Sequence, residues 1–343
     1  MANYLEGRFV RLGVTIILLL MFFPFLASCG VQTKNHQEAA SMNSNRDTIT
    51  SNTNTIRGKN IASMLLDGEY KKLYQQFSIS LKDIVKLEQF SSMGQSFVAD
   101  IVSFKQISNI KLNGSESFVW NDQSGGKGLT ATIDSKGMIT GIQIIHYTNH
   151  PKTDEAYSKT KFDLPFKEEW LVIWGGKNIF VNYHYEYEQV RYAYDFVKEK
   201  NGYSYKGNPN RNENYFAFNK DVLAPADGIV VAYVDGILDN SPVGKVNESQ
   251  PAGNFITIKH SNGEYSTVAH LKNGSVKVKS GDKVTAGQLI GKCGNSGNST
   301  EPHIHFQVST TIDQSNTTTI PISFLNNIQL IRGDSATGTI NKK

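Results

Sequence analysis

The chain begins with a mainly apolar run, residues 12–26, that follows two basic side chains, Arg8 and Arg11. This run is too short to span a bilayer comfortably. Small residues come directly after it at 27–28. A basic start, an apolar stretch and small residues are typical of a secretory leader, so we expect residues 1–28 to be removed from the mature chain.

Polar side chains dominate the next segment, residues 29–57. It is rich in Asn, Ser and Thr and has almost no large apolar residues. Such a composition cannot bury enough surface to offset the entropy of ordering the chain. The pattern therefore predicts a polar tether between the leader and the folded part.

Helical spacing begins at Ile61. Apolar residues at Ile61, Met64 and Leu65 lie three or four positions apart, which predicts a helix within residues 61–77. After a short break, residues 80–93 show the same spacing and predict a second helical stretch.

Alternating apolar positions follow these helices and predict strands, with a hairpin turn at residues 134–137. The predicted strands are residues 117–122, 128–137 and 139–147. Helices followed by strands predict a small α+β domain over residues 58–150. His146 and His150, near its end, are predicted to be surface residues.

The sequence pattern changes again near residue 160, where short strand patterns separated by Gly, Asn and Pro replace helical periodicity. The predicted strand regions are residues 221–236, 254–260, 264–270, 274–294 and 303–308. This pattern predicts a mainly antiparallel β domain over residues 160–335.

Composition narrows the class of protein. The chain has 39% hydrophobic and 19% charged residues, which argues against a wholly disordered chain and a multi-span membrane protein. Loss of Glu6, Arg8 and Arg11 with the leader lowers the formal net charge from +4 to +3. This weak positive charge suits anionic lipid or cell-wall polymer and is too small to indicate nucleic-acid binding.

The cysteines indicate an anchor rather than a disulfide framework. Residues 26–29, Leu-Ala-Ser-Cys, resemble a bacterial lipobox. That resemblance implies cleavage before Cys29 and attachment of a diacylglycerol to its sulfur, which would place the chain on the extracytoplasmic face of the membrane. A plain signal peptide is the alternative. Cys293 is then the one remaining thiol, and we expect it to be a small packed residue.

A pair of histidines near the end of the β domain suggests chemistry. A catalytic zinc commonly has three protein ligands and one open position. His303 and His305 lie two residues apart on a predicted strand, so both point to one face about 6–7 Å apart. One could bind a metal while the other reaches the open position, although this pattern alone is weak evidence.

Several other segments fit the same interpretation when they are taken in order along the chain. They strongly resemble the lysostaphin-type (LytM-like) zinc metallopeptidases, which cut peptidoglycan peptides. The matching residues are 224–225, 227–228, 269–271, 278–281, 287–288, 291, 294–299 and 303–306. The resemblance covers roughly residues 182–308 and implies a β fold of the duplicated hybrid motif type. The α+β domain weakly resembles a domain of unknown function in some Gram-positive lipoproteins.

The resemblance implies roles for individual residues. His305 matches a zinc ligand, and His270 and His303 match the two histidines that flank the reacting water and oxyanion. Asp195 matches the aspartate ligand. The usual histidine ligand four positions earlier is replaced by Arg191, which has no lone pair to offer a cation. We therefore assign His184 as the third ligand; the alternative is that zinc binding is impaired.

Together these residues predict a zinc-dependent peptidoglycan endopeptidase with one zinc ion per chain, anchored to the membrane by lipid. The alternative is a non-catalytic wall-binding or amidase-activating module of the same fold. His260 is predicted to be a structural residue at the end of a strand. A tyrosine cluster could line a substrate groove or pack in the core: Tyr183, Tyr185, Tyr187, Tyr192 and Tyr194.

Overall fold

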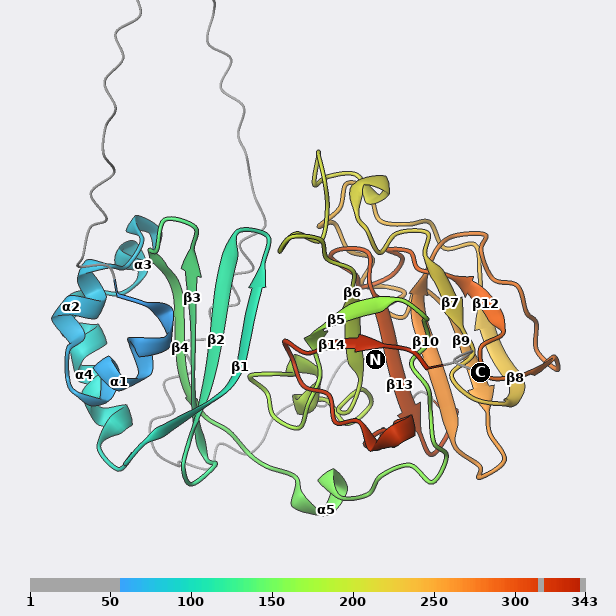
Figure 1. Cartoon of the computed structure of the whole chain (residues 1–343), viewed down its shortest axis with the longest axis horizontal. Helices are drawn as coiled ribbons and strands as arrows, with labels where there is room; N and C mark the ends of the chain where they lie inside the picture. The colour runs from blue at the N-terminus through green and yellow to red at the C-terminus, as the bar shows by residue number, and fades with distance from the viewer. Residues whose placement is uncertain (1–55, 314–317, 340–343) are drawn as a thin grey trace, which may run out of the picture. The chain divides into compact units, whose positions relative to one another are not determined.

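The computed structural model describes residues 56–313 and 318–339 (Figure 1). The predicted leader, Cys29 and all but the last two residues of the predicted tether lie outside these ranges. Within them, no helix is long and apolar enough to cross a membrane. The described residues all belong to one compact unit. The predicted boundary near residues 150–160 stays a prediction.

Short helices open the described part of the chain. The helices, with 3-10 turns written η, are η1 (Gly58–Asn60), α1 (Ile61–Leu66), α2 (Tyr70–Gln75), α3 (Ile79–Ile84), α4 (Leu87–Val98), α5 (Pro151–Asp154), η2 (Tyr183–Glu186), η3 (Asn212–Asn214) and η4 (Leu325–Asn327). Each predicted helical stretch is therefore two helices. The first is interrupted at Gly68, whose φ of 72° suits glycine, and the second at Val85, which has extended backbone.

Strands make up most of the remaining regular structure. They are β1 (Phe104–Leu112), β2 (Ser115–Asp122), β3 (Lys127–Asp134), β4 (Ile139–His146), β5 (Glu169–Trp174), β6 (Tyr194–Val197), β7 (Asp221–Leu223), β8 (Gly228–Val234), β9 (Asn254–Lys259), β10 (Tyr265–Leu271), β11 (Lys283–Val284), β12 (Leu289–Lys292), β13 (Ile304–Ser309) and β14 (Ser335–Thr337). The predicted hairpin is confirmed, because the N–H of Gly137 donates to the carbonyl of Asp134 between β3 and β4.

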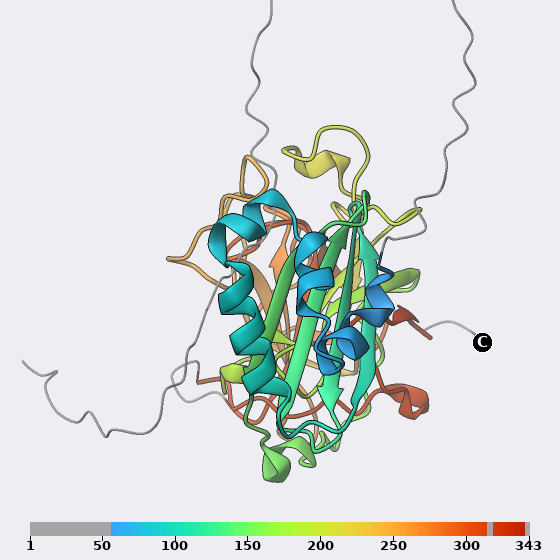
Figure 2. The same cartoon turned by 90° about the vertical axis from the view of Figure 1, so that its left-hand side faces the viewer.

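Strands β1 to β4 form an antiparallel sheet in chain order, and helices α1 to α4 cover one of its faces (Figure 2). Helix α4 packs through Phe90, Gly94 and Phe97, which share a buried stripe. A Cβ at Gly94 would lie 2.6 Å from the ring of Tyr70 on α2, so a larger residue there would have to displace that ring. A separate core of apolar side chains lies between these helices and the sheet.

The second half is built on an eight-stranded sheet, in the order β11-β8-β9-β10-β13-β6-β5-β14, beside a two-stranded sheet of β12 and β7. Every pairing is antiparallel. The predicted fold class, α+β followed by mainly antiparallel β, is confirmed. On β13, Ile304, Phe306 and Val308 are fully buried in the core, which turns His305 and Gln307 to the opposite face.

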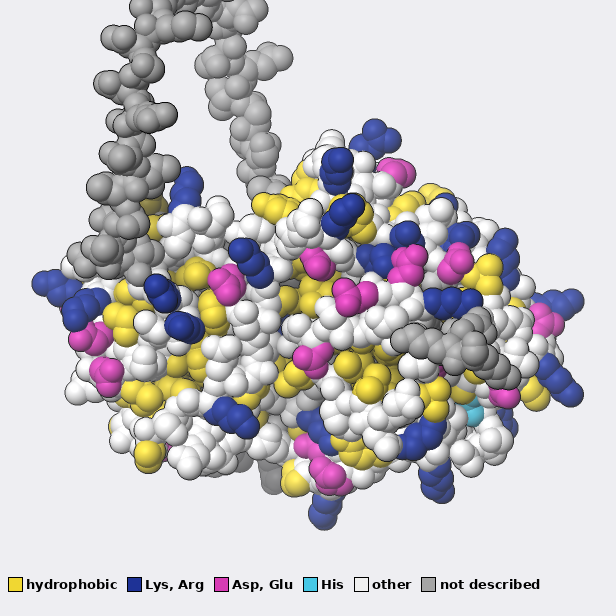
Figure 3. All heavy atoms as spheres, viewed as in Figure 1, with side chains coloured by type: hydrophobic (Ala, Val, Ile, Leu, Met, Phe, Trp, Pro, Cys, Tyr) yellow, Lys and Arg dark blue, Asp and Glu magenta, His cyan; other side chains and the backbone are white. Residues whose placement is uncertain are grey.

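Charges are mixed on the face that Figure 3 displays. Lysine and arginine side chains are interspersed there with aspartate and glutamate, and apolar side chains lie between them. The small net positive charge of the chain is therefore not gathered into one patch on this face.

Candidate metal centre

Two strands bring the first predicted ligands together. In the antiparallel register His305 of β13 lies directly opposite Asp195 of β6 and, on its other side, Ala269 of β10. Cross-strand partners point to the same face, so their side chains meet. Nδ1 of His305 lies 2.9 Å from Oδ1 of Asp195. The sheet register alone therefore brings two of the three predicted ligands together.

His270 reaches the same face through an irregularity in β10. Simple alternation would turn it away from its neighbour Ala269. The β9–β10 register shifts between Val268 and Leu271, and His270 adopts a left-handed φ of 60°. Its ring then lies with its centre 4.7 Å from that of His303. A non-glycine residue at positive φ is strained backbone of the kind found at functional sites.

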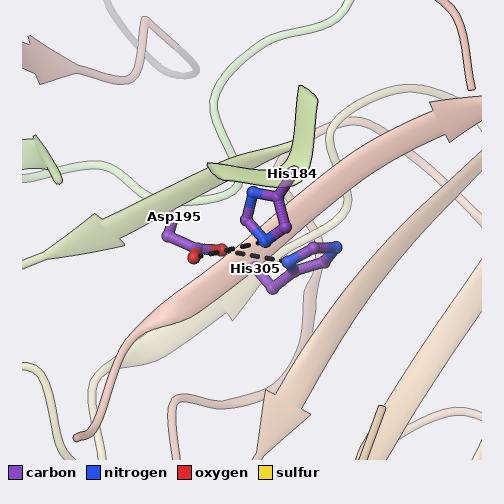
Figure 4. Close-up of side chains that lie close together, drawn as sticks. All are labelled: His184, Asp195 and His305. Carbon is purple, nitrogen blue, oxygen red and sulfur yellow. Dashed lines mark hydrogen bonds and ion pairs between the residues drawn. The ribbon is translucent and has the colours of Figure 1, made fainter. Parts of the chain in front are cut away.

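His184 comes from outside the sheet, on η2. Figure 4 shows its ring pointing toward Asp195 and His305, although the three residues belong to three different elements. Nε2 of His184 lies 3.6 Å from Oδ2 of Asp195. The ring centres of His184 and His305 are 5.0 Å apart. The chain thus turns back after η2 to place this histidine beside the aspartate, as the sequence predicts.

The three predicted ligands form a compact donor set. One nitrogen or oxygen atom from each of His184, Asp195 and His305 lies within 4.8 Å of the other two. Among the described residues this is the one group of three or more His, Cys, Asp or Glu side chains close enough to hold a metal ion. All three are buried. Their roles as zinc ligands stay predictions.

Hydrogen bonds fix which nitrogen each ligand histidine presents. Nδ1 of His184 lies 2.8 Å from Oδ1 of Asn182, an acceptor, so Nδ1 carries the proton and Nε2 faces the centre. Nε2 of His305 lies 2.9 Å from Oε1 of Gln307, so Nε2–H donates and Nδ1 faces Asp195. A second partner that fixes the tautomer in this way is typical of metal-binding histidines.

The two predicted catalytic histidines are oriented by backbone carbonyls. Nδ1 of His303 lies 2.8 Å from the carbonyl of Glu301, and Nδ1 of His270 lies 2.8 Å from the carbonyl of Ser296. A carbonyl only accepts, so both Nδ1 atoms donate and both Nε2 atoms keep a free lone pair. Nε2 of His303 is 3.7 Å from Oδ1 of Asp195. Both rings can therefore accept a proton beside the donor set.

Burial and mutual charge set the protonation states. Burial lowers the pKa of His184 to about 3, and the Asp195 carboxylate offsets only part of this effect. Burial alone would raise the pKa of Asp195, but His184, His303 and His305 outweigh it and hold this pKa below its usual range. Burial lowers the pKa of His270 well below normal. Neutral His184 and ionised Asp195 are the forms that bind a metal.

His305 behaves differently from the other histidines. Burial lowers its pKa, but the hydrogen bond and charge of Asp195 outweigh burial, so the net pKa is raised. When His305 is protonated it carries a proton on Nδ1 as well as on Nε2. A metal ion would have to displace the Nδ1 proton, so metal binding depends on pH.

Other predicted residues lie apart from the centre. His260 bonds the carbonyl of Asp227 and the hydroxyl of Ser266, which fits a structural role at the end of β9. Cys293 is fully buried in the core, as predicted. His146 is exposed and His150 half-buried, so the surface prediction for His150 holds only in part.

The tyrosine cluster divides between core and surface. Tyr185 and Tyr192 are buried, and the hydroxyls of both donate to the Asp154 carboxylate. Tyr183 and Tyr187 are exposed, and Tyr194 is half-buried and packs against the core. The ring of Tyr183 lies with its centre 4.0 Å from that of His184. Only the exposed members can line a groove beside the centre.

Sequence reasoning missed the side chains that orient the histidines. Gln307 lies two positions after His305, so strand alternation alone could have placed it on the same face. Asn182 carries the signal of an asparagine just before a turn, where it caps the backbone of η2. The roles of the Glu301 and Ser296 carbonyls could not be found from the sequence, because every residue carries a backbone carbonyl.

Comparison with known proteins supports the family resemblance. Residues 215–317 match Peptidase family M23. This range contains His270, His303 and His305, and it begins after His184 and Asp195. The M23 match confirms the resemblance inferred from the sequence.

Curated relatives match over parts of their length. An uncharacterized metalloprotease of Buchnera aphidicola is 32% identical over 154 residues, 43% of this chain and 39% of that protein. The peptidoglycan DD-endopeptidase ShyC of Vibrio cholerae is 34% identical over 87 residues, 25% of this chain and 18% of that protein. The chain thus spans about two fifths or less of the length of these relatives. The solved M23 metalloprotease pseudoalterin, from the deep sea, has 18% identity, covers 52% of this chain and 85% of that chain, and has a TM-score of 0.31.

Proposed function

We propose that this protein is a zinc-dependent peptidoglycan endopeptidase. The observation that carries the proposal is the geometry of five buried side chains. Two histidines and one aspartate offer ligand atoms within 4.8 Å, and two more histidines stand beside them with free Nε2 atoms. The match to Peptidase family M23 and the relative named as a peptidoglycan DD-endopeptidase support the substrate class.

The donor chemistry of the centre fits zinc. Two imidazoles and one carboxylate are a usual ligand set for catalytic zinc, whereas structural zinc sites are typically closed by four Cys or His ligands. The fully buried Cys293 bonds no member of this set. His184, Asp195 and His305 would hold the ion. When bound, zinc supplies a Lewis acid that lowers the pKa of water and polarises a carbonyl.

His303 and His270 would handle protons and developing charge. Each donates its Nδ1–H to a backbone carbonyl and keeps Nε2 available at the centre. A neutral imidazole can take a proton from the attacking water and, once protonated, can donate to the oxyanion or to the leaving amine. The low pKa of buried His270 keeps this ring neutral at physiological pH.

The test combines zinc content with hydrolysis. We expect the purified chain to hold one zinc ion and to release peptides from defined peptidoglycan, with the cleaved bond identified by mass spectrometry. His303→Ala should retain zinc and lose hydrolysis. Zinc-bound chain with no hydrolysis of any peptidoglycan would favour a non-catalytic module, and a His303→Ala variant as active as the parent would contradict the assigned role.

We also propose a lipid anchor at Cys29, which would hold the peptidase on the extracytoplasmic face of a bacterial membrane, beside the cell wall. The lipobox-like residues 26–29 support this proposal. Mass spectrometry of the N-terminal peptide from membranes of expressing bacteria tests it. The N-terminal peptide of the parent should begin at Cys29 and carry the mass of the attached lipid, and a parent peptide without that mass would contradict the anchor.

A further inference from the structure

Ten residues separate His184 from Asp195, and this segment must return the chain to the centre. The two residues nevertheless meet with their ligand atoms 3.6 Å apart. A flexible segment of this length would hold one ligand poorly, because each ordered residue costs about 1–2 kcal/mol of conformational entropy. Some group must therefore hold both ends of the segment together.

Asn182 contacts both ends of that segment. Its Nδ2 lies 3.0–3.1 Å from the carbonyl oxygens of Gly176, Arg191 and Ala193, so its two hydrogens serve three acceptors and one hydrogen is shared. Arg191 and Ala193 lie just before Asp195, at the far end of the segment. The three carbonyls need a donor, which fixes the amide nitrogen on their side and turns Oδ1 toward His184.

The other half of the same amide holds the ligand. Oδ1 of Asn182 accepts from Nδ1 of His184 at 2.8 Å and from its backbone N–H at 3.3 Å. Asn182 is fully buried, so no water competes for these bonds. One side chain thus fixes the tautomer and rotation of the His184 ring and closes the loop that ends at Asp195.

We propose that Asn182 is a positioning residue for the zinc site, needed for tight metal binding although it does not touch the metal. This inference rests on the proposed zinc function and deepens it. Loss of a partner that orients a metal-binding histidine typically weakens metal affinity about 10- to 100-fold. A merely structural role is the rival explanation, since Asn182 also caps η2.

Two variants and one control separate these explanations. Asn182→Ala removes the cap and the bond to the His184 ring. Asn182→Ser keeps a capping oxygen, which serves a helix as well as asparagine does, but its shorter side chain cannot span His184 and the three carbonyls. Asn254→Ala is the matched control, because Asn254 is equally buried and its amide bonds only the backbone of Ile237 and Leu271.

The measurement is zinc affinity by competition with a chromophoric chelator at fixed pH, with thermal unfolding of each variant recorded alongside. We expect both Asn182 variants to bind zinc about 10- to 100-fold more weakly, and Asn254→Ala to bind like the parent. In a His184→Ala background, Asn182→Ala should cause a smaller further loss than in the parent, because the part of its effect that acts through the His184 ring is already absent. If Asn182→Ala does not fold, Asn182→Ser carries the same test.

The outcomes distinguish this inference from the proposed function. A parent chain that binds no zinc overturns both. A parent that binds zinc, together with Asn182 variants that bind it equally well, overturns the positioning role alone. Full affinity in Asn182→Ser would likewise reduce Asn182 to a helix cap, and an equal loss in Asn254→Ala would show that any buried amide matters as much.

Discussion

Glu301 gives a prediction that links the centre to the stability of the fold. Its side chain is buried just before His303 and accepts a hydrogen bond of 2.9 Å from the hydroxyl of Ser204. Burial raises the pKa of Glu301 from 4.5 to about 7, although the bond to Ser204 opposes the shift. The folded chain therefore holds a proton on Glu301 at pH values where the unfolded chain has lost it.

The size and sign of the effect follow from that shift. A change from 4.5 to about 7 at about 1.4 kcal/mol per pKa unit corresponds to roughly 3 kcal/mol. Between these two pH values the folded state binds more protons than the unfolded state, so the free energy of unfolding falls as pH rises. Above pH 7 the folded chain has lost this full amount of stability, and below pH 4.5 it has lost none of it.

The substitution Glu301→Gln removes this titration and keeps an acceptor for Ser204. The variant should gain stability relative to the parent as pH rises from 5 to 8, by up to about 3 kcal/mol. Any effect of the new amide that does not depend on pH changes the free energy of unfolding by the same amount at every pH. Because His303 bonds the backbone carbonyl of Glu301, the orientation of its ring should not change.

Urea unfolding of both chains across this pH range measures the difference. EDTA in every sample removes zinc, so that release of zinc at low pH does not contribute to the measured stability difference. Glu248→Gln, which replaces an exposed glutamate by the same amide, is the control. A stability difference between parent and Glu301→Gln that stays constant from pH 5 to 8 would refute the reasoning.

Three further predictions test the assignments around the centre. His260→Ala should keep full zinc content, because His260 bonds Asp227 and Ser266 rather than a ligand; loss of zinc on elemental analysis would contradict its structural role. Phe306→Ala should lower the free energy of unfolding by about 3–5 kcal/mol in a denaturant titration, because this ring is fully buried, and a loss well below 1 kcal/mol would argue against the core packing. Gly297→Ala should lower the thermal midpoint, because its φ is 82° and a Cβ would lie 2.4 Å from a backbone nitrogen; an unchanged midpoint would contradict that backbone geometry.

Local pattern predicted the elements that carry the site. The period of two on a strand predicted that His303 and His305 share one face, and the structure shows that Ile304, Phe306 and Val308 fill the core on the other face. Prediction failed where burial does not alternate cleanly. Strand β1 was missed because its apolar residues Phe104, Ile107 and Ile110 recur every three positions, across a register shift between Gln106 and Ser108.

The sequence by itself determined which side chains could do the chemistry. Strand alternation placed His303 and His305 on one face. Arg191 was excluded as a ligand because a guanidinium has no lone pair to offer a cation. Those conclusions depend on spacing along one strand and on the chemistry of single residues. Both can be read without knowing the rest of the fold.

Only the tertiary structure decided how these residues meet. Asp195 faces His305 because of the β6–β13 register, and His270 joins them because a bulge with a positive φ turns it round. The direction of each ring depends on partners far away in the sequence or on backbone carbonyls, which no pattern of residue types reveals. A pairing between strands 110 positions apart, such as that of Asp195 with His305, is set by the packing of the whole sheet rather than by either segment.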